Sequence, residues 1–450
     1  MIAFINEVNA DLRSLPEEDA VADQRLDTLK DPDKVFAGRM RQFGHLIYFE
    51  TYQNTTKDQI PAGARRVDMR WEERAKGDEC RSRLVLRDYN KGKLDEMFAA
   101  TPSAEGLRLL LVISSALGLD VMCGDLNCGF MHAAPSEPIY AKPPADAHLY
   151  DSSITKDTWW ECKKAINGGR AALKDFNDWF GQELEKLGFT RLRVDSQMFV
   201  NKKLGVYFHV HVDDPCAVGT KEDLHYVFAE LSKVMLLRYT DVVKVGEKMK
   251  HLGDEYERTE KGWIQRPAKD YVRKTLSLMG MEKCNPASVL GSNEKLTESE
   301  LEKEKVELDA EGATTFRQVI GKCTFYCKNR VDMQYALKKL QADMSKPTKG
   351  SERRLKKFLR YMQGTKDYEN RIEVTKEEFA KNIVDGFSDT DHAKDTVSRK
   401  SVSCGILMIG GAVITSYSRG QTVVATSSAE AEFYGLSAIA SEMMFVLNLL

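Results

Sequence analysis

The spacing of apolar and polar residues predicts a chain of alternating strands and helices. Residues 206–212, Val-Tyr-Phe-His-Val-His-Val, alternate with a period of two, which is typical of a half-buried strand. The pattern places the valines and Phe208 on one face, and His209 and His211 on the exposed face. Two aspartates and a proline follow directly and indicate a turn. Because adjacent carboxylates repel each other, we expect a cationic group near them.

Four further segments have a clear periodicity. Residues 171–187 carry apolar side chains on one helical stripe, and residues 221–235 form a second amphipathic pattern. Residues 103–119 contain the longest apolar run and predict a buried helix, with its first residue, Ser103, as the N-cap. Residues 242–267 predict a small β element.

The last part of the chain changes character. Residues 401–418 predict two strands that are joined at Gly410–Gly411, a two-residue hairpin signal. A helix is predicted to follow, opened by a capping box of Ser427 and Glu430. Residues 291–313 are highly charged and poor in large apolar side chains, which predicts a linker or a solvated loop.

Composition limits the class of protein. Hydrophobic residues make up 42% of the 450, and 66 basic residues nearly balance 68 acidic ones, so no global field points to a nucleic-acid partner. Residues 338–366 are a local exception with ten Lys and Arg, which indicates a solvated face or a phosphate contact. Nine scattered cysteines without a Cys-x-x-Cys pair favour free thiols in a reducing compartment. No signal peptide or membrane span is expected, so we predict an intracellular protein.

Acidic residues cluster at predicted strand and helix ends. They form three groups: Asp125; the pair Asp213 and Asp214; and the set Asp389, Asp391, Glu430 and Glu432. Phosphoryl transfer with two Mg²⁺ ions requires several hard oxygen ligands from different elements. For any one of these aspartates taken alone, an ordinary turn residue is the favoured interpretation. The His-x-His pattern before Asp213 offers a different metal site, which we weigh below magnesium.

The order of the motifs is similar to that of Ty1/copia-type retrotransposon reverse transcriptase–RNase H polyproteins, over roughly residues 60–450. The stretches that carry the resemblance are "CRSRLVLRDYN", "GDLNCGFMHAAPSEPIYAKPP", "VYFHVHVDDPCAVG", "KHLGDEYERTEKG", the segment from Phe316 to Tyr368, and "GFSDTDHAKD" with the residues up to Glu442. The last of these is the strongest single match.

The resemblance implies a fold and a set of domains. The fold class is α+β: a right-hand polymerase with fingers, palm and thumb, a connection segment, and a C-terminally truncated RNase H-like α/β domain. The implied boundaries are an N-terminal extension (1–59), fingers and palm (60–290), linker with thumb and connection helices (291–380), and RNase H-like domain (381–450).

The resemblance also implies roles for particular residues. Asp125, Asp213 and Asp214 take the metal-ligand positions of the polymerase, where Mg²⁺ or Mn²⁺ would bind. Asp389 and Glu432 take those of the RNase H part, and Glu430 falls one step away from them.

The positions that contact substrate come from several segments. Those implied are Arg81 and Arg83 for the triphosphate, Arg170 near the nucleotide, Phe130 against a ribose 2′-hydroxyl, and Lys244 for proton donation. The expected partners are an RNA template, a DNA primer, the RNA–DNA hybrid and dNTPs, in the cytoplasm, in a particle or in the nucleus.

Departures from the family pattern keep other functions open. Ala171 stands where the family has Gln, Leu173 where it has Pro, and Pro215 follows the paired aspartates, where it removes a backbone donor. The chain ends before the later RNase H carboxylates, so we expect no RNase H activity. The leading hypothesis is an RNA-directed DNA polymerase. The alternatives are a decayed or repurposed fold that binds nucleic acid without polymerising, and a metal-binding protein using His209 and His211.

Overall fold

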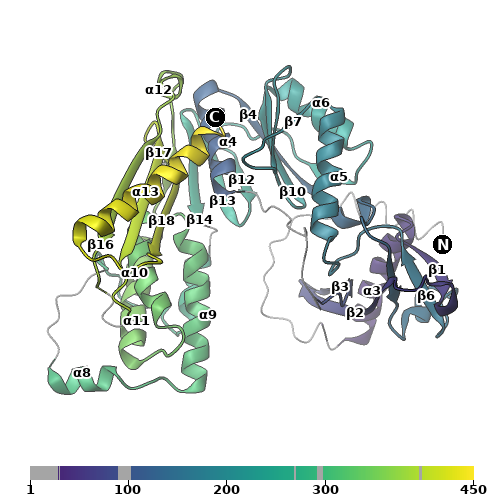
Figure 1. The fold of residues 1–450 in the computed structure, drawn as a ribbon, viewed down its shortest axis with the longest axis horizontal. Helices are drawn as coiled ribbons and strands as arrows, with labels where there is room; N and C mark the ends of the chain where they lie inside the picture. The colour runs from purple at the N-terminus through teal and green to yellow at the C-terminus, as the bar shows by residue number, and fades with distance from the viewer. Residues whose placement is uncertain (1–28, 30, 90–102, 268–269, 291–296, 395–397) are drawn as a thin grey trace. The chain divides into compact units, whose positions relative to one another are not determined.

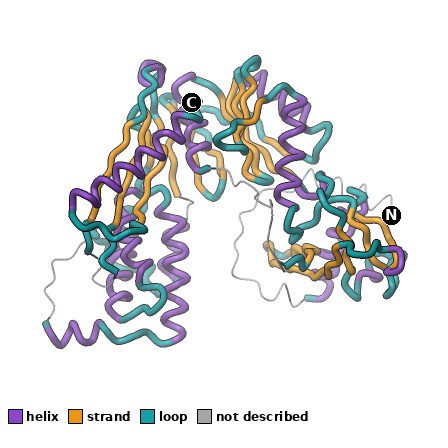
Figure 2. The backbone as a smooth tube through the Cα atoms, in the orientation of Figure 1, coloured by secondary structure: helices purple, strands orange, loops and turns teal. Residues whose placement is uncertain are grey.

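The computed structural model describes residues 29, 31–89, 103–267, 270–290, 297–394 and 398–450 (Figure 1). About half of the N-terminal extension and the start of the predicted linker lie outside these residues. The chain forms two compact units: residues 1–103 with 122–241, and residues 104–121 with 242–450. Figure 2 shows that each unit mixes helices and strands. None of the helices in the described part of the chain combines the length and apolar character needed to cross a bilayer.

The first unit contains two sheets. One has the strand order β1-β6-β5-β2-β3 and the other β11-β4-β10-β9-β8-β7. The strands are β1 Tyr52–Thr56, β2 Arg65–Lys76, β3 Glu79–Leu86, β4 Asp120–Leu126, β5 Ile139–Lys142, β6 Thr158–Cys162, β7 Thr190–Arg191, β8 Met198–Asn201, β9 Val206–His211, β10 Asp214–Gly219 and β11 Leu237–Tyr239. The helices are α3 Pro32–Tyr48, α5 Ala172–Lys186 and α6 Lys221–Leu231, with the 3-10 turns η1 Lys57–Gln59, η2 Gly129–His132 and η3 Ala147–Leu149.

Helices α5 and α6 cover one face of the six-stranded sheet. Phe208 on β9 is fully buried between Phe180 of α5 and Phe228 of α6, with ring centroids 6.3 and 5.6 Å away. Phe180 and Phe228 belong to the apolar stripes of the two helices that were predicted for residues 171–187 and 221–235. The structure confirms both helices. The opposite face of the same strands therefore carries the polar residues.

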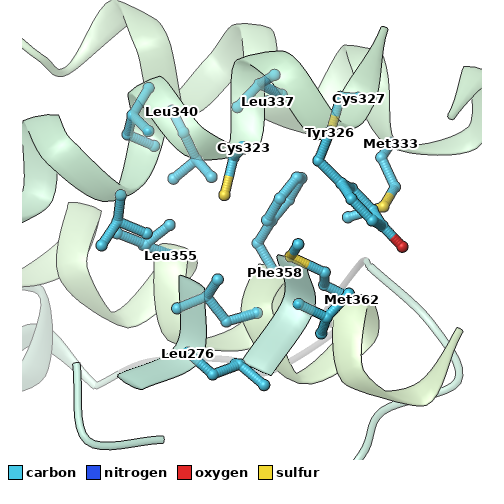
Figure 3. Packing of buried hydrophobic residues seen from close by; sticks show 14 of the residues in the cluster. Leu276, Cys323, Tyr326, Cys327, Met333, Leu337, Leu340, Leu355, Phe358 and Met362 are labelled. Atoms are coloured by element: carbon cyan, nitrogen blue, oxygen red, sulfur yellow. The ribbon is translucent and has the colours of Figure 1, made fainter. Parts of the chain in front are cut away.

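The second unit packs helices beside two smaller sheets. Its helices are α4 Ala104–Leu117, α7 Tyr271–Ser277, α8 Glu298–Glu304, α9 Ala310–Cys327, α10 Val331–Ala342, α11 Lys349–Gly364, α12 Lys376–Ala380 and α13 Ser428–Leu447. Its strands are β12 Lys248–His251, β13 Asp254–Thr259, β14 Gly262–Pro267, β15 Asn370–Ile372, β16 Asp385–Asp391, β17 Val402–Ile409 and β18 Ala412–Gly420. Figure 3 shows the core between α7, α9, α10 and α11, where Leu276, Cys323, Leu337 and Phe358 are buried together.

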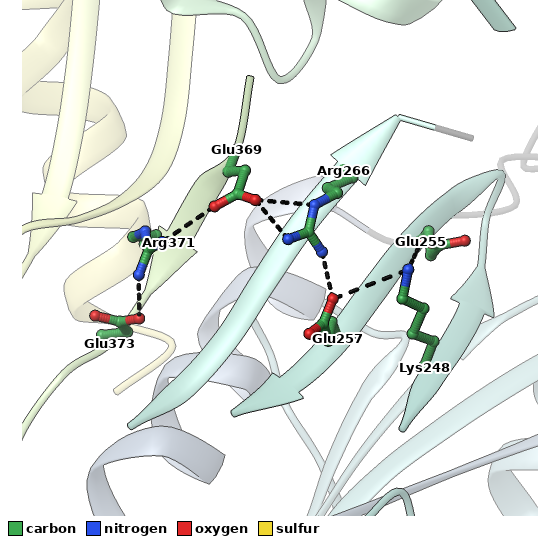
Figure 4. Close-up of polar contacts among 7 residues, drawn as sticks. All are labelled: Lys248, Glu255, Glu257, Arg266, Glu369, Arg371 and Glu373. Carbon is green, nitrogen blue, oxygen red and sulfur yellow. Dashed lines mark hydrogen bonds and ion pairs between the residues drawn. The ribbon is translucent and has the colours of Figure 1, made fainter. Parts of the chain in front are cut away.

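Charged side chains alternate in sign across the sheet β12-β13-β14-β15 (Figure 4). Arg266 lies 2.5 Å from both Glu257 and Glu369, and Arg371 continues the series from Glu369. Lys248, Glu257 and Arg266 each have an opposite charge on a neighbouring strand, so these cross-strand pairs favour the observed register, whereas Arg371 pairs with Glu369 and Glu373 of its own segment.

Local turn chemistry explains where the last elements begin. Gly410 and Gly411 both have positive φ (52° and 82°) and join β17 to β18, as a two-residue hairpin requires. Helix α13 begins after Ser427, whose side chain accepts a hydrogen bond from Glu430 N–H. The predicted capping box is only half present, because the Glu430 carboxylate accepts from Thr426.

The structure bears on two expectations about charged segments. Residues 298–304 of the predicted linker form the helix α8, opened by a capping box of Thr297 and Glu300, and Glu304 binds Arg353 of α11. The loop prediction is wrong here because good helix formers follow a strong cap. In the basic run, five of the ten cations have acidic partners within the protein: Lys339, Lys349, Arg353, Arg354 and Lys356. A large part of this charge is therefore already neutralised.

Candidate active site

A tight hairpin places two aspartates at the end of the six-stranded sheet. Asp214 pairs with His211, so that Val212 and Asp213 form a two-residue turn between β9 and β10. Val212 has φ 52°, which a β-branched residue adopts only at a cost. Such strain persists where the surrounding structure enforces it, and it is frequent at functional sites.

Pro215 does not disturb this hairpin. Val210, its partner on β9, donates its N–H away from β10, to the carbonyl of Gln197. The Val210–Pro215 pair is therefore a non-hydrogen-bonded pair of the β9–β10 ladder. The donor that proline lacks would point to the other neighbour, β4, and the hairpin keeps its register.

Two contacts fix the register between β4 and β10. Leu126 N–H donates to the carbonyl of Asp213 at 2.8 Å, and the Sγ atoms of Cys123 and Cys216 lie 3.0 Å apart. Both contacts agree with one antiparallel alignment of the strands. The hydrogen-bonded pair at Leu126 makes the cysteine pair, three positions away, a non-hydrogen-bonded one.

A row of charged and titratable side chains crosses the polar face of the sheet as a consequence. Asp125 on β4 lies directly opposite Asp214 on β10 in this alignment. Arg238 of β11 is the register partner of Asp125, and His211 of β9 is that of Asp214. The order across the four strands is Arg238, Asp125, Asp214 and His211.

The Asp213 carboxylate has a raised pKa. Burial, together with the charges of Asp214 and Asp125, raises its pKa to about 6, although Arg83 and Arg81 act in the opposite direction. Its Oδ1 atom is buried and has no hydrogen-bond partner among the described residues. The three carboxylates thus interact electrostatically in one site. The nearby positive charges do not fully compensate the negative charge of Asp213.

Gly129 makes room for this carboxylate. A Cβ atom at residue 129 would stand 2.3 Å from Asp213 Oδ1 and 3.3 Å from the ring of Phe176. The neighbouring Phe130 is half-buried, and its ring stands edge-on to Phe176 at 5.9 Å. The short turn η2 therefore holds both the predicted sugar-contacting ring and the space for Asp213.

Arg81 and Arg83 lie on β3, opposite Arg74 and Glu72 of β2. Burial and the nearby charge of Arg81 lower the pKa of Arg83, and Asp213 raises it. The structure thus brings both predicted arginines into the electrostatic surroundings of the aspartates.

Arg170 is held by Asp88. Its backbone N–H donates to Asp88 at 3.0 Å, and its Nε lies 3.5 Å from the same carboxylate. Arg65 binds Asp88 as well, at 2.5 Å. Asp88 also lines a cavity of about 330 Å³, together with Arg83 and Gly168. Arg170 therefore contacts and positions Asp88, one of the residues that line this cavity.

The remaining predicted residues lie in the second unit. Lys244 is exposed, and its backbone N–H donates to Glu247. Asp389 lies on β16, and Glu432 lies on α13 just after its first turn. A Cβ at Gly435 of α13 would meet Ser388 and Thr390, so Asp389 points to the opposite face of its strand. Asp389 and Glu432 are therefore not brought together on one face.

His209 corrects the prediction for the opening strand. Both histidines were expected on the surface, but His209 is fully buried, and its Nε2 lies 3.3 Å from the carbonyl of Ser103. The prediction is wrong because Ser103, a residue far away in the sequence, lies against this face of β9 at residue 209. Ser103 itself donates to Asp195.

Sequence reasoning missed Arg238. Its Nη2 lies 3.6 Å from Asp125 Oδ2 and donates to Asn127 Oδ1 at 2.7 Å. No local signal marks this arginine, because it meets Asp125 only through the pairing of β11 with β4. Gly129 was also missed as a residue of the site. The segment of small residues that follows Asp125 was the sequence signal that could have indicated it.

The chemistry of the carboxylates fits a hard divalent cation, since Asp125, Asp213 and Asp214 offer oxygen donors only. The buried, unpartnered oxygen of Asp213 also fits a cation. Within the ranges that the structure describes, no three His, Cys, Asp or Glu side chains are already gathered as a metal site. Binding would therefore require side-chain adjustment, including release of Asp125 from Arg238.

A family model described as reverse transcriptase (RNA-dependent DNA polymerase) matches residues 50–290, more than half of the chain. The chain belongs to the reverse transcriptase family. Several relatives of this reverse transcriptase chain are Pol polyproteins of plant transposons. The Pol polyprotein of transposon RE1 from Arabidopsis thaliana is 26% identical over 389 residues, covering 82% of this chain and 24% of the relative. The Pol polyprotein of transposon TNT 1-94 from Nicotiana tabacum is 23% identical over 406 residues, covering 86% and 29%.

These names confirm the resemblance to copia-type reverse transcriptases, and the chain spans about a quarter of the length of the curated relatives it matches. A solved foamy viral protease-reverse transcriptase in complex with double-stranded DNA covers 97% of this chain and 66% of its own, with 11% identity and a TM-score of 0.49.

Proposed function

We propose that this reverse transcriptase chain polymerises DNA on an RNA template, adding dNTPs to a primer 3′-hydroxyl. The observation that carries the proposal is the shared electrostatic site of Asp125, Asp213 and Asp214, with Arg81 and Arg83 beside it. In this proposal the first unit supplies the fingers and palm, and helices of the second unit act as the thumb and connection. The partners are the DNA primer, the RNA template and the RNA–DNA hybrid.

The proposed roles follow from charge and geometry. Asp125, Asp213 and Asp214 hold the metal ions, Mg²⁺ or Mn²⁺, whose chemistry is to activate the 3′-hydroxyl and stabilise the leaving pyrophosphate. Arg81 and Arg83 neutralise the incoming triphosphate, because guanidinium groups bind phosphate oxygens in a fixed fork.

Primer extension on an RNA template with Mg²⁺ or Mn²⁺ tests the proposal. Wild-type protein should extend the primer, and Asp213→Asn should abolish extension. Asp157→Asn, which changes an exposed aspartate of the same unit, should leave extension unchanged. If the wild type extends no primer with either metal, the polymerase proposal fails.

A second candidate is a nucleic-acid-binding protein that does not polymerise. It is favoured by the ion pair between Asp125 and Arg238, which occupies a carboxylate that the polymerase needs. Binding of a primer–template that weakens steeply with salt, without extension, would support it.

For the C-terminal part we propose no RNase H activity, because Asp389 points away from the helix that carries Glu432. Cleavage of an RNA–DNA hybrid that is lost in Asp389→Asn would contradict this.

A further inference from the structure

Two cysteines face each other beside the aspartate row. Cys123 of β4 and Cys216 of β10 have Sγ atoms 3.0 Å apart, with the Cys123 thiol donating to Cys216. They form a non-hydrogen-bonded pair of antiparallel strands, the position where opposite Cα atoms come closest, about 4.5 Å apart. This spacing is within the range that a disulfide spans.

The two thiols differ in accessibility. Cys216 is completely buried, whereas Cys123 is partly exposed. Cys123 is thus the sulfur that a small dissolved oxidant reaches first, and Cys216 is placed behind it as the resolving thiol. His209 is the register partner of Cys216 on β9 and closes the far side of the pair.

The pair stands apart from the other free cysteines. Cys323 and Cys327 are neighbouring thiols one helical turn apart in α9, but both are buried in the helical core. Burial raises the pKa of Cys323 to about 12, which is typical of inert structural thiols. A metal site at the cysteine pair has no support, since no third ligand is gathered there among the described residues.

We propose that Cys123 and Cys216 are a site of reversible oxidation, which a peroxide converts into a disulfide between β4 and β10. The Cys123 sulfur attacks a peroxide oxygen, the O–O bond breaks, and a sulfenic acid and one water form. Cys216 then attacks the Cys123 sulfur, the S–O bond breaks, and a second water leaves. In total two thiols and one hydrogen peroxide give one disulfide and two waters, the thiols losing two electrons to the peroxide.

The disulfide would join the two strands that carry Asp125 and Asp214, because each cysteine lies two residues from one of these aspartates on the same strand face. It would draw the sulfurs from 3.0 Å to the covalent distance of about 2.05 Å. The proposal concerns the covalent state of the protein and does not depend on the proposed polymerase activity.

The test is thiol counting on the full chain after treatment with one equivalent of hydrogen peroxide. The nine thiols of the reduced wild type should fall to seven, and dithiothreitol should restore nine. Peptide mapping without reductant should give one linked peptide pair, containing residues 123 and 216.

Variants separate this pair from general oxidation. Cys216→Ala and Cys123→Ser should each begin with eight thiols and form no internal disulfide. Cys404→Ser, which removes a partly exposed cysteine of the second unit, should fall from eight to six. The wild-type peptide map needs no variant, so a poorly folded Cys216→Ala protein leaves the test intact. The proposal is overturned if the wild type keeps nine thiols, if the linked peptides join other cysteines, or if Cys123 is oxidised without linkage.

Discussion

Asp125 of β4 and Arg238 of β11 lie directly opposite each other on antiparallel strands, with Oδ2 and Nη2 3.6 Å apart. A cation that binds Asp125 must compete with this guanidinium. We expect Arg238→Gln to lower the Mg²⁺ or Mn²⁺ concentration that half-maximally raises the melting temperature, by about fivefold. This equals about 1 kcal/mol, the upper range for a partly exposed ion pair. Arg193→Gln changes an exposed arginine of the same unit. It should require the same metal concentration as the wild type to raise the melting temperature half-maximally. A higher metal requirement in Arg238→Gln would show that Arg238 assists binding instead.

Gly129 should be intolerant of even a methyl group. In Gly129→Ala the new Cβ would meet Asp213 Oδ1 at 2.3 Å, so the carboxylate must move. We expect primer extension to fall by about 100-fold, as a displacement of about 1 Å can cause. Gly321→Ala is the matched control, because its Cβ meets nothing within 4 Å in α9. It should leave extension unchanged and raise stability by about 0.5–1 kcal/mol. Normal primer extension by Gly129→Ala would show that the position of Asp213 is not required for the activity.

The raised pKa of Asp213 predicts a pH dependence of stability in the metal-free protein. Its folded pKa of about 6 lies above the ordinary 3.8, so the folded state holds this proton more tightly than the unfolded state. The stabilisation is complete below about pH 4 and is lost as the pH rises through about 6. Urea unfolding with a chelator should show wild type losing up to about 3 kcal/mol relative to Asp213→Asn between pH 4 and 7. If the free energy of unfolding had the same pH dependence in the two proteins, the raised pKa of Asp213 would be contradicted.

Arg330 should be essential to the helical core of the second unit. It is 1% exposed and donates to both oxygens of Asp332, to the hydroxyl of Tyr326, and to Thr365. We expect Arg330→Met to lower the free energy of unfolding by about 3–5 kcal/mol, since partners of a buried charge are left unsatisfied. Arg371→Met, in the exposed series of Figure 4, should cost less than about 1 kcal/mol. Equal losses in chemical denaturation would refute this difference.

Phe130 should control the choice of sugar if the polymerase proposal holds. Its ring is held edge-on against Phe176, so its position is set by packing. Phe130→Val should raise incorporation of ribonucleotides at least about tenfold relative to dNTPs, because the smaller side chain admits a 2′-hydroxyl. Single-nucleotide extension with matched dNTP and rNTP pairs measures the ratio. An unchanged ratio, with dNTP incorporation intact, would assign the discrimination to another residue.

Local patterns were sufficient to predict several elements. The stripe of Phe176 and Phe180 predicted α5, Gly410–Gly411 predicted the β17–β18 hairpin, and the alternation before Asp213 predicted β9. In each case the signal lies within one element or one turn, where side-chain period and turn residues determine the outcome.

Residues that depend on the pairing of distant segments could not be predicted in the same way. His209 is buried where Ser103, 106 positions earlier, lies against it, and Arg170 is held by Asp88, 82 positions earlier. The pair of Arg238 with Asp125 likewise needs the register of β11 against β4. The resemblance supplied the aspartates of the site with Arg81 and Arg83, but not Arg238.

The division of the chain has a consequence for any attempt to work with its parts. The backbone passes between the two units three times, after residues 103, 121 and 241, because α4 belongs to the second unit while β4 belongs largely to the first. A fragment ending at residue 241 would retain α4 without its own core and would expose Leu109, Leu110 and Leu111, all fully buried in the intact chain. Neither unit can therefore be expressed as one uninterrupted stretch, and a shortened version requires a designed connection in place of residues 104–121.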